Sequence, residues 1–271
     1  MLLDKDLLAR RFGRAAPVYR RHARIQERAA AGLLAAVLRR PPPGSPRILD
    51  VGCGTGTFTE LLLEAFPGAQ ALALDLSEGM VVEARRRLVG CRVAFTVRDI
   101  EAGYPDGRFD LVASSMALQW MLDPGTVVRG AAARLGEGGV LAFAAPAEGT
   151  LPELREAYAA AADALRLRAW RHPGLVFQPA ARWEEWARKA FAEVEVEELR
   201  MVERHPDARA VLEGIRGVGA NDCGGGAGPN AVRLLRHALA TYDARFAGDG
   251  CVRATWRIAI VTARGPRRSR T

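Results

Sequence analysis

The chain has 271 residues, of which 49% are hydrophobic and 26% are charged. This size and composition predict one large domain, or one domain with an inserted cap, and they exclude a disordered chain. No apolar stretch approaches the roughly 20 residues of a transmembrane helix. The acidic start lacks the basic and apolar segments of a signal peptide, and the four cysteines (Cys53, Cys91, Cys223 and Cys251) show neither a CxxC pair nor metal-ligand spacing. We therefore expect a cytoplasmic protein with reduced thiols, no membrane partner and no metal.

The net charge of +8 comes almost entirely from arginine, because Lys5 and Lys189 are the only lysines. A nucleic acid would suit such a basic chain, and so would an acidic protein. The abundance of arginine and alanine is also typical of coding in a GC-rich genome, which requires no partner. The charge alone leaves these three interpretations open.

The periodicity of apolar residues predicts an α/β fold. Two helices come first, at 4–15 and 18–39, and a proline-rich break follows at 41–46. Strands then alternate with helices, which predicts a parallel sheet with helices on both faces. The expected strands are 47–52, 70–75, 92–98, 109–115 and 139–145, and the expected helices between them are 57–66, 78–89 and 124–135.

The second half of the chain has a different pattern. Helices are expected at 151–171, 179–192, 207–217 and 231–246, and strands at 192–204 and 252–263. A segment at 217–228 is glycine-rich enough to predict a mobile loop, and the tail at 264–270 is expected to be frayed.

Residues 47–56 read Arg-Ile-Leu-Asp-Val-Gly-Cys-Gly-Thr-Gly and join a predicted strand to a predicted helix. The glycines Gly52, Gly54 and Gly56 permit positive φ and let a ligand lie against bare backbone. Their spacing differs from the G-x-G-x-x-G of dinucleotide folds, and no Gly-Lys-Ser/Thr follows as it does in a P-loop. The turn therefore predicts a nucleotide-type crevice for another ligand.

Acidic residues follow each of the first three strands. Asp50 directly precedes the glycine turn, where it suits an ammonium group better than a pyrophosphate. Asp75 ends the second strand, where a carboxylate can bind a ribose diol. Asp99 ends the third strand, where it can accept from an exocyclic amine while Ile100 covers a base. Each aspartate alone is as typical of a turn or helix cap, but together, at the carboxyl ends of parallel strands, they predict S-adenosylmethionine.

These features resemble the class I S-adenosylmethionine-dependent methyltransferases across residues 47–145. The resemblance implies a Rossmann-like, mostly parallel seven-stranded sheet with helices on both faces and a helical lid. It places the glycine turn on the methionine end and Ser114 in the methyl channel. The cofactor-binding residues that it implies are Tyr19, Asp50, Gly52, Cys53, Gly54, Gly56, Asp75, Leu76, Met80, Asp99, Ile100, Ser114 and Ser115.

Segments outside the sheet bear on the methyl acceptor. They are Phe-Gly-Arg-Ala-Ala-Pro-Val-Tyr-Arg-Arg-His-Ala at 12–23, Ala-Leu-Gln-Trp at 117–120, Gly-Thr-Leu-Pro-Glu-Leu at 149–154 and Ile-Arg-Gly-Val-Gly-Ala at 215–220. Together they resemble the malonyl-acyl-carrier-protein O-methyltransferases of biotin synthesis, from about residue 5 to residue 263. The resemblance implies methyl transfer to the free carboxylate of malonyl on acyl carrier protein, an acidic partner for the arginine-rich N-terminal helices. The glycine-rich segment 221–228 and the basic tail depart from the pattern.

The residues that we expect to act on the substrate are Tyr19, His22, Gln119, Trp120 and Arg216. No strong base is needed, because a carboxylate with a pKa near ~4 is already ionised. An arginine can fork onto that carboxylate; Arg216 is preferred to Arg14, whose alternative is a solvated helix face. Tyr19 can close over the methionine end or hydrogen-bond the carboxylate, and His22 shares its helix face. Core packing is the alternative for the aromatic residues, including Trp170 and Phe177 in the cap.

The expected organisation is a helical lid at 1–40 and a cofactor-binding domain at 41–271, with cap segments at 151–190 and 205–230. A methyltransferase of a free small dicarboxylic acid is the alternative activity. A nucleic-acid methyltransferase is disfavoured, because Ser-Ser-Met-Ala stands at 114–117 in place of Asn/Asp-Pro-Pro-aromatic. A non-catalytic binding module would need a blocked cofactor site, and these glycines and acids are intact.

Overall fold

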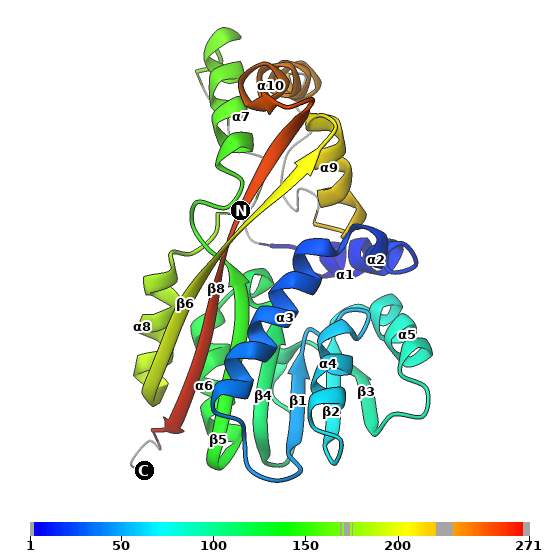
Figure 1. Ribbon diagram of the computed structural model, residues 1–271, viewed down its shortest axis with the longest axis vertical. Coiled ribbons are helices and arrows are strands. Elements are labelled where there is room, and N and C mark those ends of the chain that lie inside the picture. Colours follow the sequence, from blue (N-terminus) through cyan, green and yellow to red (C-terminus); the bar gives the residue numbers. More distant parts are fainter. Residues whose placement is uncertain (1–2, 169, 171–173, 175, 221–229, 268–271) are drawn as a thin grey trace.

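The computed structural model describes residues 3–168, 170, 174, 176–220 and 230–267. Helices and strands alternate through the first half, as the sequence predicts (Figure 1). The helices are α1 (Lys5–Ala15), α2 (Tyr19–His22), α3 (Arg24–Arg39), α4 (Thr57–Ala65), α5 (Glu78–Arg87), α6 (Pro124–Arg134), α7 (Pro152–Ala164), α8 (Ala180–Ala190), α9 (Ala208–Gly217) and α10 (Ala231–Phe246), with 3-10 turns η1 (Ile100–Ala102) and η2 (Leu118–Trp120). The strands are β1 (Arg47–Val51), β2 (Gln70–Asp75), β3 (Val93–Val97), β4 (Phe109–Ser115), β5 (Leu135–Pro146), β6 (Phe191–His205), β7 (Ala247–Gly248) and β8 (Cys251–Pro266).

The strands form one sheet in the order β3-β2-β1-β4-β5-β8-β6, with the two-residue β7 pairing β8 off this path. The pairs from β3 to β5 are parallel, and β8 runs antiparallel to both β5 and β6. The order in which strands are added to the sheet reverses at β1, because β2 lies on one side of it and β4 on the other. This reversal opens a crevice at the carboxyl ends of the strands. The predicted fold, a mostly parallel sheet of seven strands, is confirmed.

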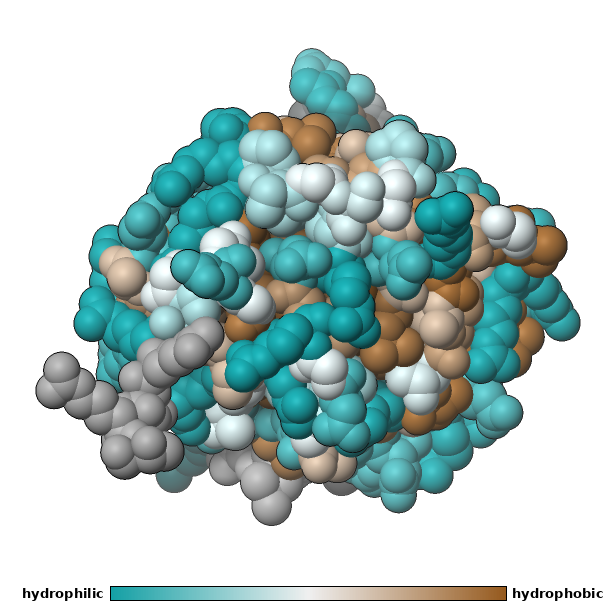
Figure 2. Space-filling model, turned by 90° about the horizontal axis from the view of Figure 1, so that it is seen from below, coloured by the Kyte–Doolittle hydropathy of each residue, from teal (hydrophilic) through white to brown (hydrophobic). Residues whose placement is uncertain are grey.

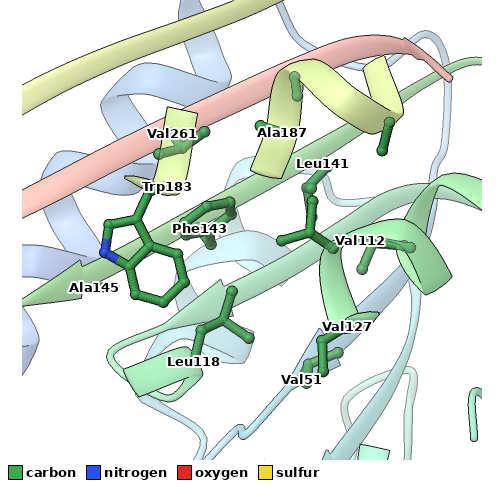
Figure 3. Close-up of a cluster of buried hydrophobic side chains, with 14 of the residues drawn as sticks. Val51, Val112, Leu118, Val127, Leu141, Phe143, Ala145, Trp183, Ala187 and Val261 are labelled. Carbon is green, nitrogen blue, oxygen red and sulfur yellow. The ribbon is translucent and has the colours of Figure 1, made fainter. Parts of the chain in front are cut away.

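Alternating side chains of the strands build a core on each face of the sheet. On one face Ile48 and Leu111 pack with α3 and α4. On the other face Leu49 and Val112 pack with α6 and α8. Figure 3 shows the second core, in which Trp183 of α8 lies over β5. Helices therefore cover both faces of the sheet, as the sequence predicts.

The ribbon of β6 and β8 continues beyond the core sheet (Figure 1). β8 pairs with β5 only from Ile258 to Arg264, whereas it pairs with β6 from Val252 to Pro266. The free half of the ribbon carries a third hydrophobic cluster, which draws on α7, α9 and α10. We call these three helices and that half of the ribbon the cap. Helix α8 lies outside it, because α8 packs on the sheet.

Several element boundaries differ from the prediction. The expected helix 18–39 divides at Ala23, whose ψ of 24° interrupts the helix between α2 and α3. The expected helix 151–171 ends at Ala164, and Arg166 has a φ of 51° just beyond it. The tail was expected to be frayed from 264, but β8 continues to Pro266 because that residue pairs with Phe191. Asn221 to Gly228, most of the expected glycine loop, lie outside the described residues.

Within the described ranges, no helix has the length and apolarity to cross a membrane. The face seen from below in Figure 2 is largely hydrophilic, with smaller hydrophobic areas between the polar side chains. Exposed large hydrophobic residues such as Val89 and Val176 are far apart in the sequence, as is usual for a folded domain.

Candidate active site

A cavity lies where the carboxyl ends of β1 to β4 meet the N-terminal helices. Its empty volume is about 960 Å³, including the open mouth. The floor is made by the segments that follow the strands, at 51–55, 74–77, 98–100 and 115–117. The roof is made by residues of α1, α2 and α3, which lie over these strand ends in Figure 1. The predicted site residues on its wall are Tyr19, Gly52, Cys53, Gly54, Asp75, Leu76, Met80, Asp99, Ile100, Ser115 and Trp120.

The glycine turn presents bare backbone to this cavity. Gly52, Gly54 and Gly56 have φ values of 73°, 54° and 83°. A Cβ on Gly52 would lie 2.3 Å from Cβ of Ala117, so the loop after β4 can approach only a glycine. A Cβ on Gly54 would meet nothing within 4 Å, so the space beside it is open to a ligand.

Asp75 shapes the centre of the floor. Its Oδ2 accepts from Gly54 N over 2.9 Å and its Oδ1 from Ser77 N over 2.8 Å. Burial raises the pKa of Asp75, although the hydrogen bonds from the backbone oppose that shift. Each carboxylate oxygen keeps a free lone pair, so Asp75 can bind a diol while it holds the glycine turn in place.

Asp50 lies beneath the turn rather than on the cavity wall. It is fully buried, and Thr59 Oγ1 donates to its Oδ2 over 2.6 Å. Its Oδ1 has no partner among the described residues. Burial raises the pKa of Asp50 to about 7, with the hydrogen bond from Thr59 opposing the shift and Asp75 adding to it. Gly56 also lies off the wall, at the start of α4.

The end of the cavity formed after β3 carries Asp99 and Ile100, as the resemblance implies. Asp99 caps η1, because its Oδ1 accepts from Glu101 N over 2.9 Å. Its Oδ2 accepts from Lys5 Nζ at 2.5 Å. The prediction missed Lys5. The one signal in the sequence was that lysine is rare in this arginine-rich chain.

The helical wall contributes Tyr19 and Gln26. Burial, with the charge of Asp75, raises the pKa of Tyr19 above its usual value, and the neutral phenol can donate a hydrogen bond. Gln26 also lines the cavity, and its buried Oε1 has no partner among the described residues. The prediction missed Gln26, because in the sequence it is one polar residue of an expected amphipathic helix.

The segment after β4 forms the side of the cavity. Met116 has a φ of 56°, a strained conformation for a residue with a side chain, and it lines the cavity. Trp120 packs edge to face on Phe12 of α1. Gln119 turns away, since its Nε2 donates to Met116 O over 2.7 Å. Ser114 is buried and donates to Val51 O over 2.8 Å, so Ser115 is the serine that reaches the cavity.

The remaining candidates lie outside the cavity. Arg14, His22 and Arg216 are exposed, and none of them is on the cavity wall. The ring of His22 lies against α9, because a Cβ on Gly217 would fall 2.3 Å from it. Trp170 packs with the cap cluster, and Phe177 is half-buried away from the cavity.

The Gly-Thr-Leu-Pro-Glu-Leu segment anchors the cap. Thr150 Oγ1 donates to Arg257 O over 2.8 Å, and Leu151, with a φ of 52°, starts α7. Buried Glu153 accepts from both N and Oγ1 of Thr255, over 3.1 and 2.6 Å. The motif therefore fastens α7 to β8, which places the cap relative to the sheet.

In the part of the chain that the structure describes, no group of three or more His, Cys, Asp or Glu side chains is close enough to hold an ion. The polar groups of the cavity are backbone N–H groups, carboxylates, the Tyr19 hydroxyl, the Gln26 amide and the cationic side chains of Lys5 and Arg98. These groups suit an uncharged nucleoside with an amino acid substituent.

Known proteins share both the sequence and the fold. A family described as a methyltransferase domain matches residues 48–139. A malonyl-[acyl-carrier protein] O-methyltransferase of Acetivibrio thermocellus is 32% identical over 97% of this chain and 95% of its own length. One from Bacillus cytotoxicus is 30% identical over 100% of this chain and 96% of its own length.

Solved structures share the fold. The YcgJ protein of Bacillus subtilis has a TM-score of 0.58 and 18% identity, covering 88% of this chain and 99% of that one. A phosphoethanolamine N-methyltransferase of Haemonchus contortus, in complex with S-adenosyl-L-methionine, has a TM-score of 0.53 and 20% identity, covering 87% of this chain and 52% of that one. At these identities the likeness shows a common architecture.

Proposed function

The chain belongs to the malonyl-[acyl-carrier protein] O-methyltransferase family, and we propose that its cavity brings S-adenosylmethionine to the free carboxylate of malonyl on acyl carrier protein. The product is a methyl ester, in which the carboxylate charge is masked. This methyl transfer serves biotin synthesis in the family. One observation supports the site: the same cavity is lined by Gly54, Asp75 and Asp99, which follow or end three successive strands.

The residues fit the cofactor. Bare backbone at Gly52 and Gly54 would receive the methionine end, Asp75 the ribose diol, and Asp99 with Ile100 the adenine. When bound, S-adenosylmethionine supplies an electrophilic methyl group on a positively charged sulfur. Asp50 would act on the methionine end only through the turn that it supports from beneath, since Thr59 already holds one of its oxygens.

The chain need only orient the acceptor and exclude water. A malonyl carboxylate is ionised at neutral pH, so no base has to remove a proton. Positioning of this kind contributes roughly 7–11 kcal/mol in favourable cases. Tyr19 and Gln26 lie on the helical wall, where the phenol O–H of one and the amide N–H of the other can donate to one carboxylate oxygen and leave the other free.

Trp120 and Phe12 would close the cavity over the reacting atoms and keep water out. His22 of α2 lies against Gly217, the residue after Arg216, where α2 meets α9. We propose that His22 and Arg216 act on the acceptor where it enters between the lid and the cap, rather than inside the cavity. Gln119 supports the backbone of Met116 and so acts through the shape of the wall.

The lid helices would also bind the carrier protein. Residues 10–28 contain seven arginines and one acidic residue, Glu27. Arg20 and Arg21 of α2 and Arg24 at the start of α3 are exposed. Exposed pairs of this kind contribute under ~1 kcal/mol each, so we expect them to steer an acidic carrier protein toward the cavity. This use of the positive charge requires no nucleic acid and no membrane.

Methyl transfer from labelled S-adenosylmethionine tests the acceptor. We expect efficient transfer to malonyl on the carrier protein, weaker transfer to malonyl on a short thioester, and none to acetyl on the carrier protein. Equal transfer to a free dicarboxylic acid would overturn the assignment of the carrier-bound acceptor and support the alternative activity.

A further inference from the structure

Lys5, the first residue of α1, joins segments that are far apart in the sequence. Its Nζ lies 2.5 Å from Asp99 Oδ2 and 2.5 Å from Glu101 Oε2. The exposed fractions of the three side chains are only 18%, 29% and 14%. Water therefore screens these ion pairs less than it screens pairs on an open surface.

Glu101 extends this connection to the rim of the cavity. Its Oε2 accepts from Leu122 N over 2.9 Å and its Oε1 from Asp123 N over 2.7 Å. Trp120 and Met121, directly before these residues, line the cavity. Through Glu101, the amino group of Lys5 ties α1 to the loop that carries both of them.

Lys5 also determines how Asp99 is presented. The two oxygens of Asp99 accept from Glu101 N and from Lys5 Nζ, and Oδ2 retains a lone pair for an exocyclic amine. Burial lowers the pKa of Lys5, but the hydrogen bonds to Asp99 and Glu101 outweigh this and leave it above its usual value.

Helix α1 forms the roof of the cavity through Leu8, Ala9 and Phe12. Its far end is fixed by close packing on α5, since a Cβ on Gly79 would lie 2.7 Å from Cα of Gly13. The near end is held by the ion pairs of Lys5. The ion pairs are thus the contact that must break for this end of the roof to open.

We propose that Lys5 is a positioning residue for the nucleoside, which orients Asp99 and holds α1 closed over the bound cofactor. Lys5 thereby sets how long the cofactor and its product remain in the cavity. This inference rests on the proposed function in one respect, that the cavity binds S-adenosylmethionine and S-adenosylhomocysteine.

The chain contains its own matched control. Lys189, the only other lysine, pairs with Glu185 on the exposed surface of α8 at 2.7 Å. Lys5→Met and Lys189→Met remove the same charge and keep a side chain of similar length. The dissociation rate and Kd of S-adenosylhomocysteine are then measured for the full chain and both variants, at low and at high salt.

We expect Lys5→Met to release S-adenosylhomocysteine about tenfold faster than the unmodified chain, and Lys189→Met to differ by less than about twofold. High salt should speed release from the unmodified chain and barely affect Lys5→Met, because the screened contact is already absent. Amide hydrogen exchange in α1 of the bound protein should rise in Lys5→Met alone.

Release and salt dependence in Lys5→Met that match the unmodified chain would overturn the inference. If Lys5→Met fails to fold, Lys5→Gln provides the same test, because glutamine keeps a polar side chain and loses the charge that faces Asp99 and Glu101. If the unmodified chain binds no S-adenosylhomocysteine, the proposed cofactor is itself wrong and the role of Lys5 falls with it.

Discussion

Phe12 of α1 packs edge to face on Trp120 of η2, with ring centroids 5.4 Å apart and planes at 84°. One ring comes from the lid and the other from the loop after β4, and both line the cavity. Their contact joins the two walls that have to separate when a ligand enters. The lid is therefore held by apolar packing at Phe12 and by ion pairs at Lys5.

Removal of the aromatic contact should loosen ligand binding. An edge-to-face pair contributes about 0.5–1.5 kcal/mol beyond its buried area, so we expect Phe12→Ala to weaken S-adenosylhomocysteine binding by up to about tenfold. Isothermal titration measures this directly. Phe246→Ala is the matched control, because it removes a similar pair with Tyr242 at 5.2 Å in the cap. Equal losses in the two variants would mean that the Phe12 contact has no special part in closure.

Asp50 should make the stability of the protein depend on pH. Its pKa is about 7 when folded and near 3.9 when unfolded. The folded state therefore binds the extra proton between these values, and stability is lost as the pH rises through them. The shift of about three units corresponds to a loss of at most about 4 kcal/mol above pH 7.

The variant Asp50→Asn keeps an acceptor for Thr59 and cannot titrate. Urea unfolding at pH 5 and pH 8 should show a smaller loss of stability for Asp50→Asn than for the unmodified chain, because groups such as Asp75 contribute to both proteins. An identical pH dependence in the two would show that Asp50 does not carry a raised pKa.

A change that destabilises the cap should leave cofactor binding unaffected. Glu153→Ala leaves Thr255 N and Oγ1 without their acceptor in a buried position, which costs roughly 1–3 kcal/mol. We expect the free energy of unfolding and the rate of methyl transfer to fall, while the Kd for S-adenosylhomocysteine is unchanged. Glu156→Ala, exposed on the same helix, is the control. Loss of cofactor binding in Glu153→Ala would instead mean that the cap and the sheet fold as one unit.

The arginines of α2 should act on the carrier protein alone. Reversal of charge in Arg20→Glu/Arg21→Glu should raise KM for malonyl on the carrier protein about tenfold and reduce its dependence on salt, without effect on the Kd of S-adenosylhomocysteine. The same reversal at Arg233 and Arg236, exposed on α10, is the control. A larger effect of the α10 variant would move the carrier-binding surface from the lid to the cap.

The sequence predicted what depends on local periodicity and turn chemistry. The strands and helices from β1 to β5 follow from alternating and helical apolar spacing, and the glycine turn follows from three residues with positive φ. The fold class and the family are confirmed. The break at Ala23 was missed because a run of alanine and arginine has no local signal against a continuous helix.

What was missed depends on contacts between distant parts of the chain. Lys5 meets Asp99 across 94 positions, and such a pair leaves no trace in local spacing. Gln26 reads as one polar residue in an amphipathic helix until the fold places it on the cavity. The role of Thr150 and Glu153 as an anchor becomes evident only when β8, more than a hundred positions later, lies beside them.

Intact-mass spectrometry of malonyl-carrier protein shows most directly whether the malonyl carboxylate becomes a methyl ester. After incubation with this protein and S-adenosylmethionine, we expect a gain of one methyl group that mild base removes and that acetyl-carrier protein never acquires. An unchanged mass, with cofactor binding demonstrated separately, would contradict the acceptor assignment while leaving the fold and the cofactor site in place.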